Sequence, residues 1–208
     1  MKAHTKETQD AINPANAITL LKEGNQRFIE NKKVDRDLLA QVKQTTTGQY
    51  PFATILSCID SRVSAELIFD QGVGDIFSAR VAGNIVNEDI LGSMEFACKL
   101  AGTKVIVVLG HTSCGAVKGA VDDAQMGNLT ALLSKIRPAV HAIAEPKDSA
   151  ERTSKNLDFV NTVANKNVQL TIDNIRTKSP VLKEMEDNNE IAIIGAMYDI
   201  VDGKVHFI

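Results

Sequence analysis

The run KVIVVLGH at residues 104–111 constrains the fold more than any other part of the chain. It is apolar at almost every position, which is typical of a strand buried on both faces. PFATILSC at 51–58 has the same character, and DIFSARVAG at 75–83 and IAIIGAMYDI at 191–200 are further strand candidates. Strands covered on both faces need helices on both sides of the sheet, so these runs predict a layered α/β fold.

Helical patterns fill the intervals between these strands. Residues 15–32 place apolar side chains at approximately helical spacing, and Asn87 is suited to cap a helix that runs to Ala101. The other helices that we expect are a weak one within 36–49, a short one within 64–72, one after the turn at 112–114, a stretch near 128–144, and a long region from 156 to 185 that bends or breaks near Ser179 and Pro180.

The end of the chain predicts how the sheet is finished. A DG pair at 202–203 separates the strand at 191–200 from KVHFI, which is the pattern of a hairpin with an antiparallel edge strand. We therefore predict an α/β fold with a central, mostly parallel sheet of four to five strands, flanked by helices. The whole chain, 1–208, is expected to form one domain, with an N-terminal helical arm at 1–48 and the α/β core at 49–208. The apolar face of the arm can pack on this core or on a partner chain.

Composition excludes several classes of function. Apolar residues make up 44% and charged residues 24%, as in ordinary globular proteins, and the net charge of -3 offers no basic surface for nucleic acid. No apolar stretch approaches the roughly 18 residues that a membrane span needs, and the first residues lack the apolar region of a signal peptide. We expect a cytoplasmic protein without membrane or nucleic-acid partners, although a signal cleaved before this numbering begins stays open.

The three cysteines are an odd number in a chain that is too large to need disulfides, so we expect reduced thiols that act as ligands, nucleophiles or core residues. Cys98 lies on the apolar stripe of the helix that begins after Asn87, which predicts a core residue. Cys58 and His111 instead follow buried strands, and Cys114 comes three residues after His111. In open parallel sheets, ligands gather beyond the carboxyl ends of the strands, so these three side chains are expected to meet there.

Two thiolates and an imidazole are a donor set that suits Zn²⁺. Three protein ligands leave the fourth tetrahedral position for water, which is the arrangement of catalytic sites, whereas structural sites are closed. Zinc makes a bound water acidic enough to supply hydroxide near neutral pH. Asp60 and Arg62 follow Cys58 at two-residue intervals and can pair bidentately. In that pairing Arg62 keeps Asp60 ionised and away from the metal, and Asp60 accepts a hydrogen bond from the water.

CIDSR at 58–62 and HTSCG at 111–115 together resemble the Cys-x-Asp-x-Arg and His-x-x-Cys motifs of the beta class of carbonic anhydrases. The resemblance extends from LLKEGNQRF near the start to GAMYDIVDGKV near the end. It implies zinc held by Cys58, His111 and Cys114, an Asp60–Arg62 dyad, and reversible hydration of carbon dioxide to bicarbonate. It also implies a homodimer or a higher assembly built from dimers, in which the N-terminal arm embraces the neighbour.

The same resemblance implies substrate-binding residues. Gln49 matches a glutamine that, in the subtype with a constitutively open zinc, bonds substrate across the dimer interface. Phe77 matches a position on the apolar wall of the pocket, and Gly115 matches one whose backbone amide meets the substrate. Ala82 stands where plant-type members often have valine, and Phe96 replaces a frequent tyrosine.

Two other functions remain open from the sequence. Relatives with this fold hydrolyse carbon disulfide or carbonyl sulfide, and no residue firmly excludes those substrates. A zinc-stabilised structural protein or a thiol-based redox protein is a different class. The sequence argues against it, because a Cys-x-x-Cys pair and a fourth ligand are both missing.

Overall fold

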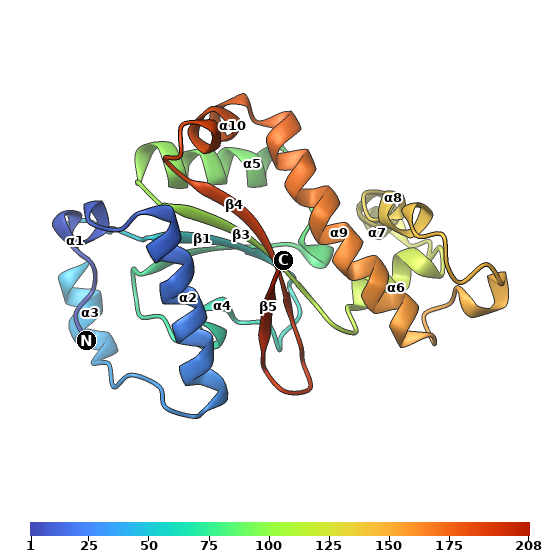
Figure 1. Cartoon of the computed structure of the whole chain (residues 1–208), viewed down its shortest axis with the longest axis horizontal. Coiled ribbons are helices and arrows are strands. Elements are labelled where there is room, and N and C mark those ends of the chain that lie inside the picture. Colours follow the sequence, from blue (N-terminus) through green and yellow to red (C-terminus); the bar gives the residue numbers. More distant parts are fainter.

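The computed structural model describes all residues from Met1 to Ile208 and is built around one five-stranded sheet (Figure 1). The strands lie in the order β2-β1-β3-β4-β5. Their bounds are β1 (Ala53–Ser57), β2 (Ile76–Arg80), β3 (Val105–His111), β4 (Ala192–Tyr198) and β5 (Val205–Phe207). The first four run parallel, and β5 pairs antiparallel with β4. The predicted α/β class, the mostly parallel sheet and the antiparallel edge are all confirmed.

The central strands are buried along their whole length, and their carboxyl ends lie at one edge of the sheet. Every residue of β1 and of β3 is buried, as their continuous apolar runs predict. Ser57 lies beside Leu109 in the pairing of these two strands, so both strands end near the same edge of the sheet. Tyr198 lies beside His111, which brings the end of β4 to that edge as well.

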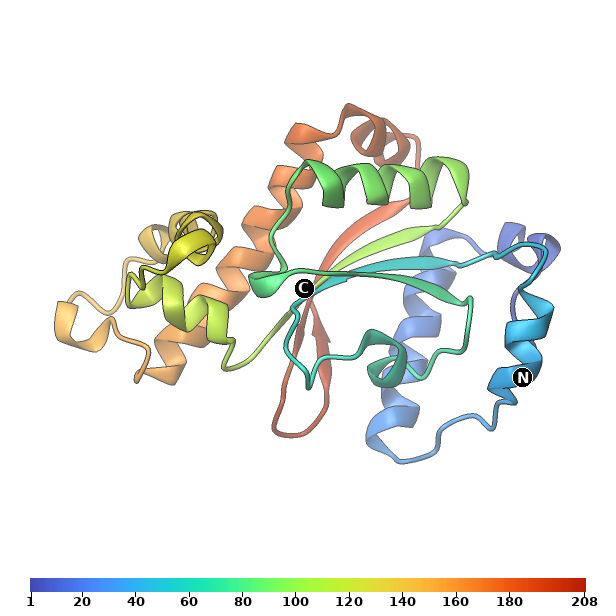
Figure 2. The ribbon, with the colours of Figure 1, turned by 180° about the vertical axis from the view of Figure 1, so that it is seen from behind.

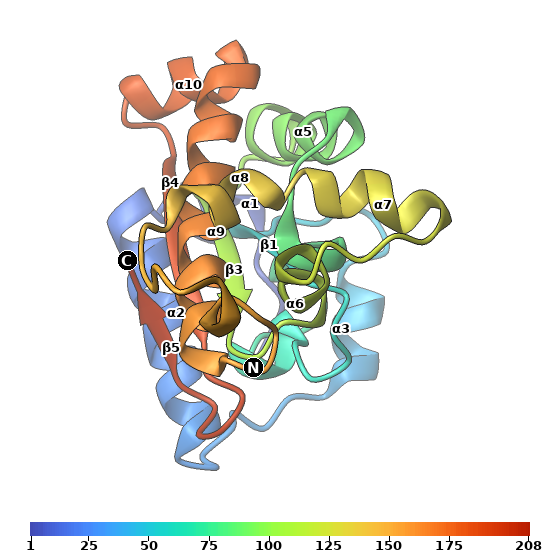
Figure 3. The same cartoon turned by 90° about the vertical axis from the view of Figure 1, so that its right-hand side faces the viewer.

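Helices cover both faces of this sheet, which Figure 2 and Figure 3 show from behind and from the side. The α-helices are α1 (Lys6–Asp10), α2 (Pro14–Ile29), α3 (Leu38–Gln44), α4 (Ala65–Ile68), α5 (Glu88–Glu95), α6 (Gly115–Val121), α7 (Gly127–Ser134), α8 (Arg137–Ala142), α9 (Leu157–Lys178) and α10 (Pro180–Asp187). None of them combines the length and the apolar composition needed to cross a bilayer.

Helices α2 and α4 cover one face. Asn13 caps α2 by accepting a hydrogen bond from the amide of Asn16, and Pro14 opens the first turn, where its missing N–H costs nothing. Ala17 and Leu21 are fully buried in a cluster that includes Ile55 and Val107 of the sheet. The apolar face of the N-terminal helix is therefore core of its own chain.

The opposite face is covered by α5, α6, α8, α9 and α10. Asn87 caps α5, as predicted, through the amide of Ile90. Cys98 follows in a π-helical turn, Phe96–Leu100, and is buried in the larger core cluster, which confirms its assignment as a core residue. The long C-terminal helical region breaks at Ser179, which ends α9 and caps α10.

Two helical details differ from the sequence patterns. The expected stretch near 128–144 is two helices, because the chain turns at Lys135 and Ile136. Helix α8 then starts at Arg137, with Pro138 in its first turn. Helix α1 was not predicted. Gln9 of α1 is buried and donates to the backbone oxygens of Pro51 and Ala101, so contacts distant in sequence stabilise this five-residue helix.

Candidate metal centre

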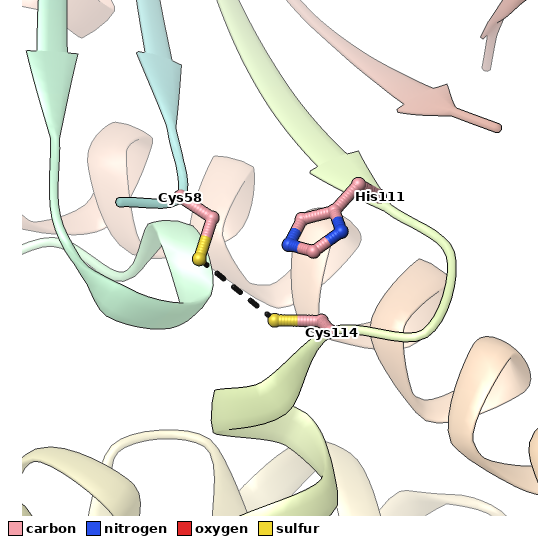
Figure 4. Close-up of side chains that lie close together, drawn as sticks. All are labelled: Cys58, His111 and Cys114. Carbon is pink, nitrogen blue, oxygen red and sulfur yellow. Dashed lines mark hydrogen bonds between the residues drawn. The ribbon is translucent and has the colours of Figure 1, made fainter. Parts of the chain in front are cut away.

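Three side chains predicted as ligands meet beyond the carboxyl ends of β1 and β3. Cys58 directly follows β1, His111 is the last residue of β3, and Cys114 directly precedes α6. Their ligand atoms all lie within 4.8 Å of one another, and all three residues are buried. Figure 4 shows the side chains converging on one space between the strand ends and α6.

The two sulfurs are spaced for a shared ion. Sγ of Cys58 lies 3.9 Å from Sγ of Cys114, and both thiols are free. A disulfide would require roughly 2.05 Å. Two sulfurs bound to one tetrahedral zinc at about 2.3 Å each would lie about 3.8 Å apart. The observed spacing fits a metal and excludes a disulfide.

The imidazole of His111 is oriented so that Nε2 can bind the same metal ion as the two sulfurs. Nδ1 lies 2.9 Å from the backbone oxygen of Thr112, which fixes the ring and leaves Nε2 as the free nitrogen. The residue is completely buried, and Nε2 has no hydrogen-bond partner. A buried polar atom without a partner is costly, and a metal ion between the two thiols would satisfy this one.

The thiols are electrostatically coupled. Hydrogen bonding from Cys114, with a smaller contribution from the backbone amide of Gly83, lowers the pKa of Cys58, although burial opposes the shift. The hydrogen bond to Cys58, burial and the charge of Cys58 together raise the pKa of Cys114. One thiolate is thus favoured without metal, and binding a dication to both sulfurs releases a proton.

Gly83 contributes through its backbone. Its amide donates to Sγ of Cys58 over 3.4 Å, from a left-handed conformation with φ of +70°. An added Cβ would lie 2.4 Å from Cδ1 of Ile136. The left-handed conformation favours glycine here, and any larger residue would also have to displace the side chain of Ile136.

Asp60 and Arg62 form the predicted pair. Oδ1 of Asp60 accepts from the backbone amide and Nε of Arg62 at 3.0 and 2.9 Å, and Oδ2 accepts from Nη2 at 2.7 Å. These bonds hold the pKa of Asp60 well below its usual range. Oδ2 also lies 4.0 Å from Nε2 of His111, so the carboxylate borders the ligand group while Arg62 restrains it.

Arg80 is a contact that the sequence did not suggest. It ends β2, and its guanidinium donates to the backbone oxygens of Cys58 and Asp60 at 3.1 and 2.7 Å. Both bonds fix the segment that carries the first ligand and the carboxylate. The sequence shows only an arginine near the end of a strand candidate. Its position beside Cys58 depends on the order of the strands in the sheet.

The four predicted substrate-binding residues fall into two groups. Ala82 is two residues beyond β2, beside the Gly83 amide that contacts Cys58, and Gly115 starts α6 directly after Cys114. Phe77 lies near the start of β2. The strand separates it by about 13 Å from Val81, the residue that precedes Ala82 at the other end. Gln49 is exposed and precedes β1, at the strand end opposite to Cys58. One chain thus brings Ala82 and Gly115 to the centre, but not Phe77 or Gln49.

Phe77 instead lines a hollow of about 700 Å³ over β2 and α5. Its ring packs edge-on against Phe96, with 6.3 Å between the ring centroids, and Phe96 is 53% exposed. None of the three ligand residues lines this hollow.

The sequence and fold identify the class of protein to which this centre belongs. The sequence profile of a family described as carbonic anhydrase matches residues 53–205. The chain is similar to carbonic anhydrase 2 of Mycobacterium tuberculosis, at 35% identity over 193 residues, covering 92% of this chain and 91% of that protein. It is also similar to a carbonic anhydrase of Mycolicibacterium smegmatis, at 32% identity over 199 residues, covering 93% and 92% of the two chains.

Solved structures agree on the fold. The beta-carbonic anhydrase CcaA superposes with a TM-score of 0.71 at 24% identity, covering 92% of this chain and 91% of that one. A tetrameric beta-carbonic anhydrase of Sordaria macrospora gives a TM-score of 0.69 at 24% identity, covering 80% and 85%. The chain belongs to the carbonic anhydrase family, in its beta class. It is therefore an enzyme, and carbonic anhydrases are lyases.

Proposed function

We propose that this enzyme is zinc-dependent and interconverts carbon dioxide and bicarbonate, with Cys58, His111 and Cys114 as the zinc ligands. The observation that carries the proposal is the convergence of two free thiols and an unpartnered, buried Nε2 within 4.8 Å. Sulfur and imidazole donors favour zinc over magnesium or calcium, which prefer oxygen.

The donor count supports a catalytic site rather than a structural one. Cys98 is the remaining cysteine. It lies in the turn Phe96–Leu100, its sulfur is hydrogen-bonded to the hydroxyl of Thr103, and it is not part of the ligand group. Three ligands leave one tetrahedral position open. A bound zinc ion would supply Lewis-acid chemistry there, making a water acidic enough to yield a nucleophile near neutral pH.

Asp60 has the geometry to orient solvent at this position. Arg62 occupies Oδ1 with two hydrogen bonds and Oδ2 with one, so Oδ2 keeps the capacity to accept another. An ionised carboxylate can only accept, so Asp60 would fix the orientation of a donating solvent molecule beside His111. Arg62 keeps the carboxylate ionised and turned away from direct ligation.

The substrate pocket is proposed to need two copies of the chain. Ala82 and Gly115 border the centre of their own chain, so they can contact substrate there. Gln49 and Phe77 can do so only from a partner, because they lie at the other end of β1 and β2. The Sordaria macrospora proteins are described as tetrameric, which supports a homodimer or a higher assembly for this chain. A cytoplasmic location remains a prediction from the sequence.

Metal content and turnover test the proposal together. The purified protein should contain about one zinc per chain and hydrate carbon dioxide in stopped-flow assays, and a chelator should remove both the zinc and the activity. Carbon disulfide and carbonyl sulfide are assayed with the same preparation. Faster turnover of either sulfur compound than of carbon dioxide would reassign the substrate, and full activity without metal would reject the zinc site.

A further inference from the structure

The turn between His111 and Cys114 decides whether two of the three donor atoms meet. His111 ends β3 and Cys114 precedes α6, so Thr112 and Ser113 alone connect them. Ser113 has a φ of +56°, in the left-handed region that side chains other than glycine disfavour. Such a conformation persists only where the surroundings hold it.

Thr112 is held by the neighbouring strand. Its amide donates to the backbone oxygen of Tyr198 at 3.0 Å, which extends the pairing of β3 with β4. Its hydroxyl lies 3.3 Å from Oδ1 of Asp199 and accepts from the amide of Ile200 at 3.1 Å. These contacts anchor the first half of the turn to the sheet, but none of them reaches Ser113.

Asn161 holds the second half. Its Oδ1 accepts a hydrogen bond from the amide of Ser113 at 2.8 Å, across 48 residues of sequence. Asn161 lies on α9, and the neighbouring Phe159, Val160 and Val163 are buried in the core. The acceptor is therefore carried by a packed helix rather than by another loop, and its position is well defined.

We propose that Asn161 is a positioning residue for the metal centre, whose side-chain oxygen holds Ser113 in the conformation that brings Sγ of Cys114 to the other two donors. The inference rests on the proposed metal site. Asn161 does not bind the ion itself. It acts in the way that outer hydrogen-bond partners act at other metal sites, by reducing the freedom of a ligand before the metal arrives.

The test is the affinity of the full-length, metal-free protein for Zn²⁺, measured by competition with a chelator. Asn161→Ala should weaken zinc binding roughly 10- to 100-fold, the usual effect of losing an outer partner. Asn161→Asp retains an oxygen acceptor and should stay close to the unsubstituted protein. Asn161→Ser, which is too short to reach Ser113, provides a second loss variant if the alanine variant does not fold.

Asn165→Ala is the matched control. Asn165 lies one turn further along α9, and its Oδ1 accepts from Gln169 instead of from the turn. This variant should bind zinc as the unsubstituted protein does. Two further measurements separate positioning from general stability: amide hydrogen exchange at Ser113, and the thiolate-to-cobalt absorption of the Co²⁺-loaded protein. Both should change in Asn161→Ala and Asn161→Ser but not in Asn165→Ala.

The outcomes distinguish this inference from the function on which it rests. If the unsubstituted protein binds neither Zn²⁺ nor Co²⁺, the proposed metal site is wrong and the inference falls with it. If that protein binds zinc tightly and the alanine and serine variants bind equally tightly, the metal site stands and the role of Asn161 is rejected. Equal losses in the alanine and aspartate variants would also reject it, because the aspartate keeps the acceptor.

Discussion

The carboxylate of Asp60 lies 4.0 Å from Nε2 of His111, yet its hydrogen bonds all come from Arg62. This carboxylate borders the candidate metal centre but is held by a cation and does not join the ligand group. In the proposed function, Arg62 keeps Asp60 ionised and fixes the direction in which the free lone pair of Oδ2 points.

Arg62→Ala is therefore expected to lower kcat/KM for carbon dioxide hydration by roughly 100-fold, because the orientation of Asp60 is lost while the three metal donors remain. Stopped-flow kinetics with parallel metal analysis measures both quantities. Arg176→Ala is the control, since Arg176 forms a similar bidentate pair with Glu186 and also bonds Ile193, near the opposite end of β4. Unchanged turnover in Arg62→Ala would exclude the proposed role.

Cys58→Ala is expected to abolish stoichiometric zinc binding, because two donors hold the ion far less well than three. Cys98→Ala removes a thiol that is equally buried but lies outside the ligand group, so it should retain one zinc per chain. Metal analysis after dialysis compares the two variants. Equal zinc contents would show that Cys58 is not a ligand.

Gly24→Ala is expected to lower the free energy of unfolding by about 1–3 kcal/mol, although alanine favours helices. A Cβ at Gly24 would lie 1.8 Å from the backbone oxygen of Phe69, so α2 would have to move away from α4. Gly92→Ala, in α5, meets no atom within 4 Å and should raise the free energy of unfolding by about 0.5–1 kcal/mol. Urea denaturation at equal protein concentration tests both signs.

Asp70 predicts how stability depends on pH. It is buried between Arg27 and Arg36, with ion-pair distances of 2.6 and 2.5 Å. Burial alone would raise the pKa of Asp70, but hydrogen bonds from Arg27 and Arg36 outweigh it and the pKa is lowered. The resulting stabilisation is present above the unfolded-state pKa of about 3.9 and is lost as the pH falls through the lower folded-state pKa.

Asp70→Asn should accordingly lower the free energy of unfolding by about 3 kcal/mol at pH 7, because it leaves two arginines without their partner. The difference from the unsubstituted protein should shrink below about pH 4. Denaturation of both proteins with chelator present separates this effect from metal release. The control is Asp187→Asn, which breaks an exposed pair with Lys183 and should cost less than about 1 kcal/mol. A pH-independent difference for Asp70→Asn would contradict the account.

The sequence was sufficient to predict the sheet and the convergence of Cys58, His111 and Cys114, because the two share one cause. Strands buried on both faces leave continuous apolar runs, and the polar residues that end those runs lie where parallel strands open a site. Cys58 and His111 mark such ends, and the close spacing of Cys114 brings it to the same place.

The contacts that brace the centre were not predictable in the same way. Arg80 depends on β2 lying beside β1, and Asn161 depends on where a helix from a later part of the chain crosses β3. Neither relation leaves a local pattern. Phe77 and Gln49 differ from these contacts. In the proposed assembly they reach the substrate only from a second copy of the chain, and no periodicity in the sequence encodes how two copies pack.

X-ray absorption at the zinc edge of the purified protein would identify the atoms that bind the metal. Two sulfur neighbours at about 2.3 Å, one imidazole nitrogen at about 2.0–2.1 Å and one further light atom are expected. Loss of one sulfur neighbour in Cys58→Ala would assign that ligand. A zinc site with fewer than two sulfurs in the unsubstituted protein, or with a third sulfur closing it, would contradict the account.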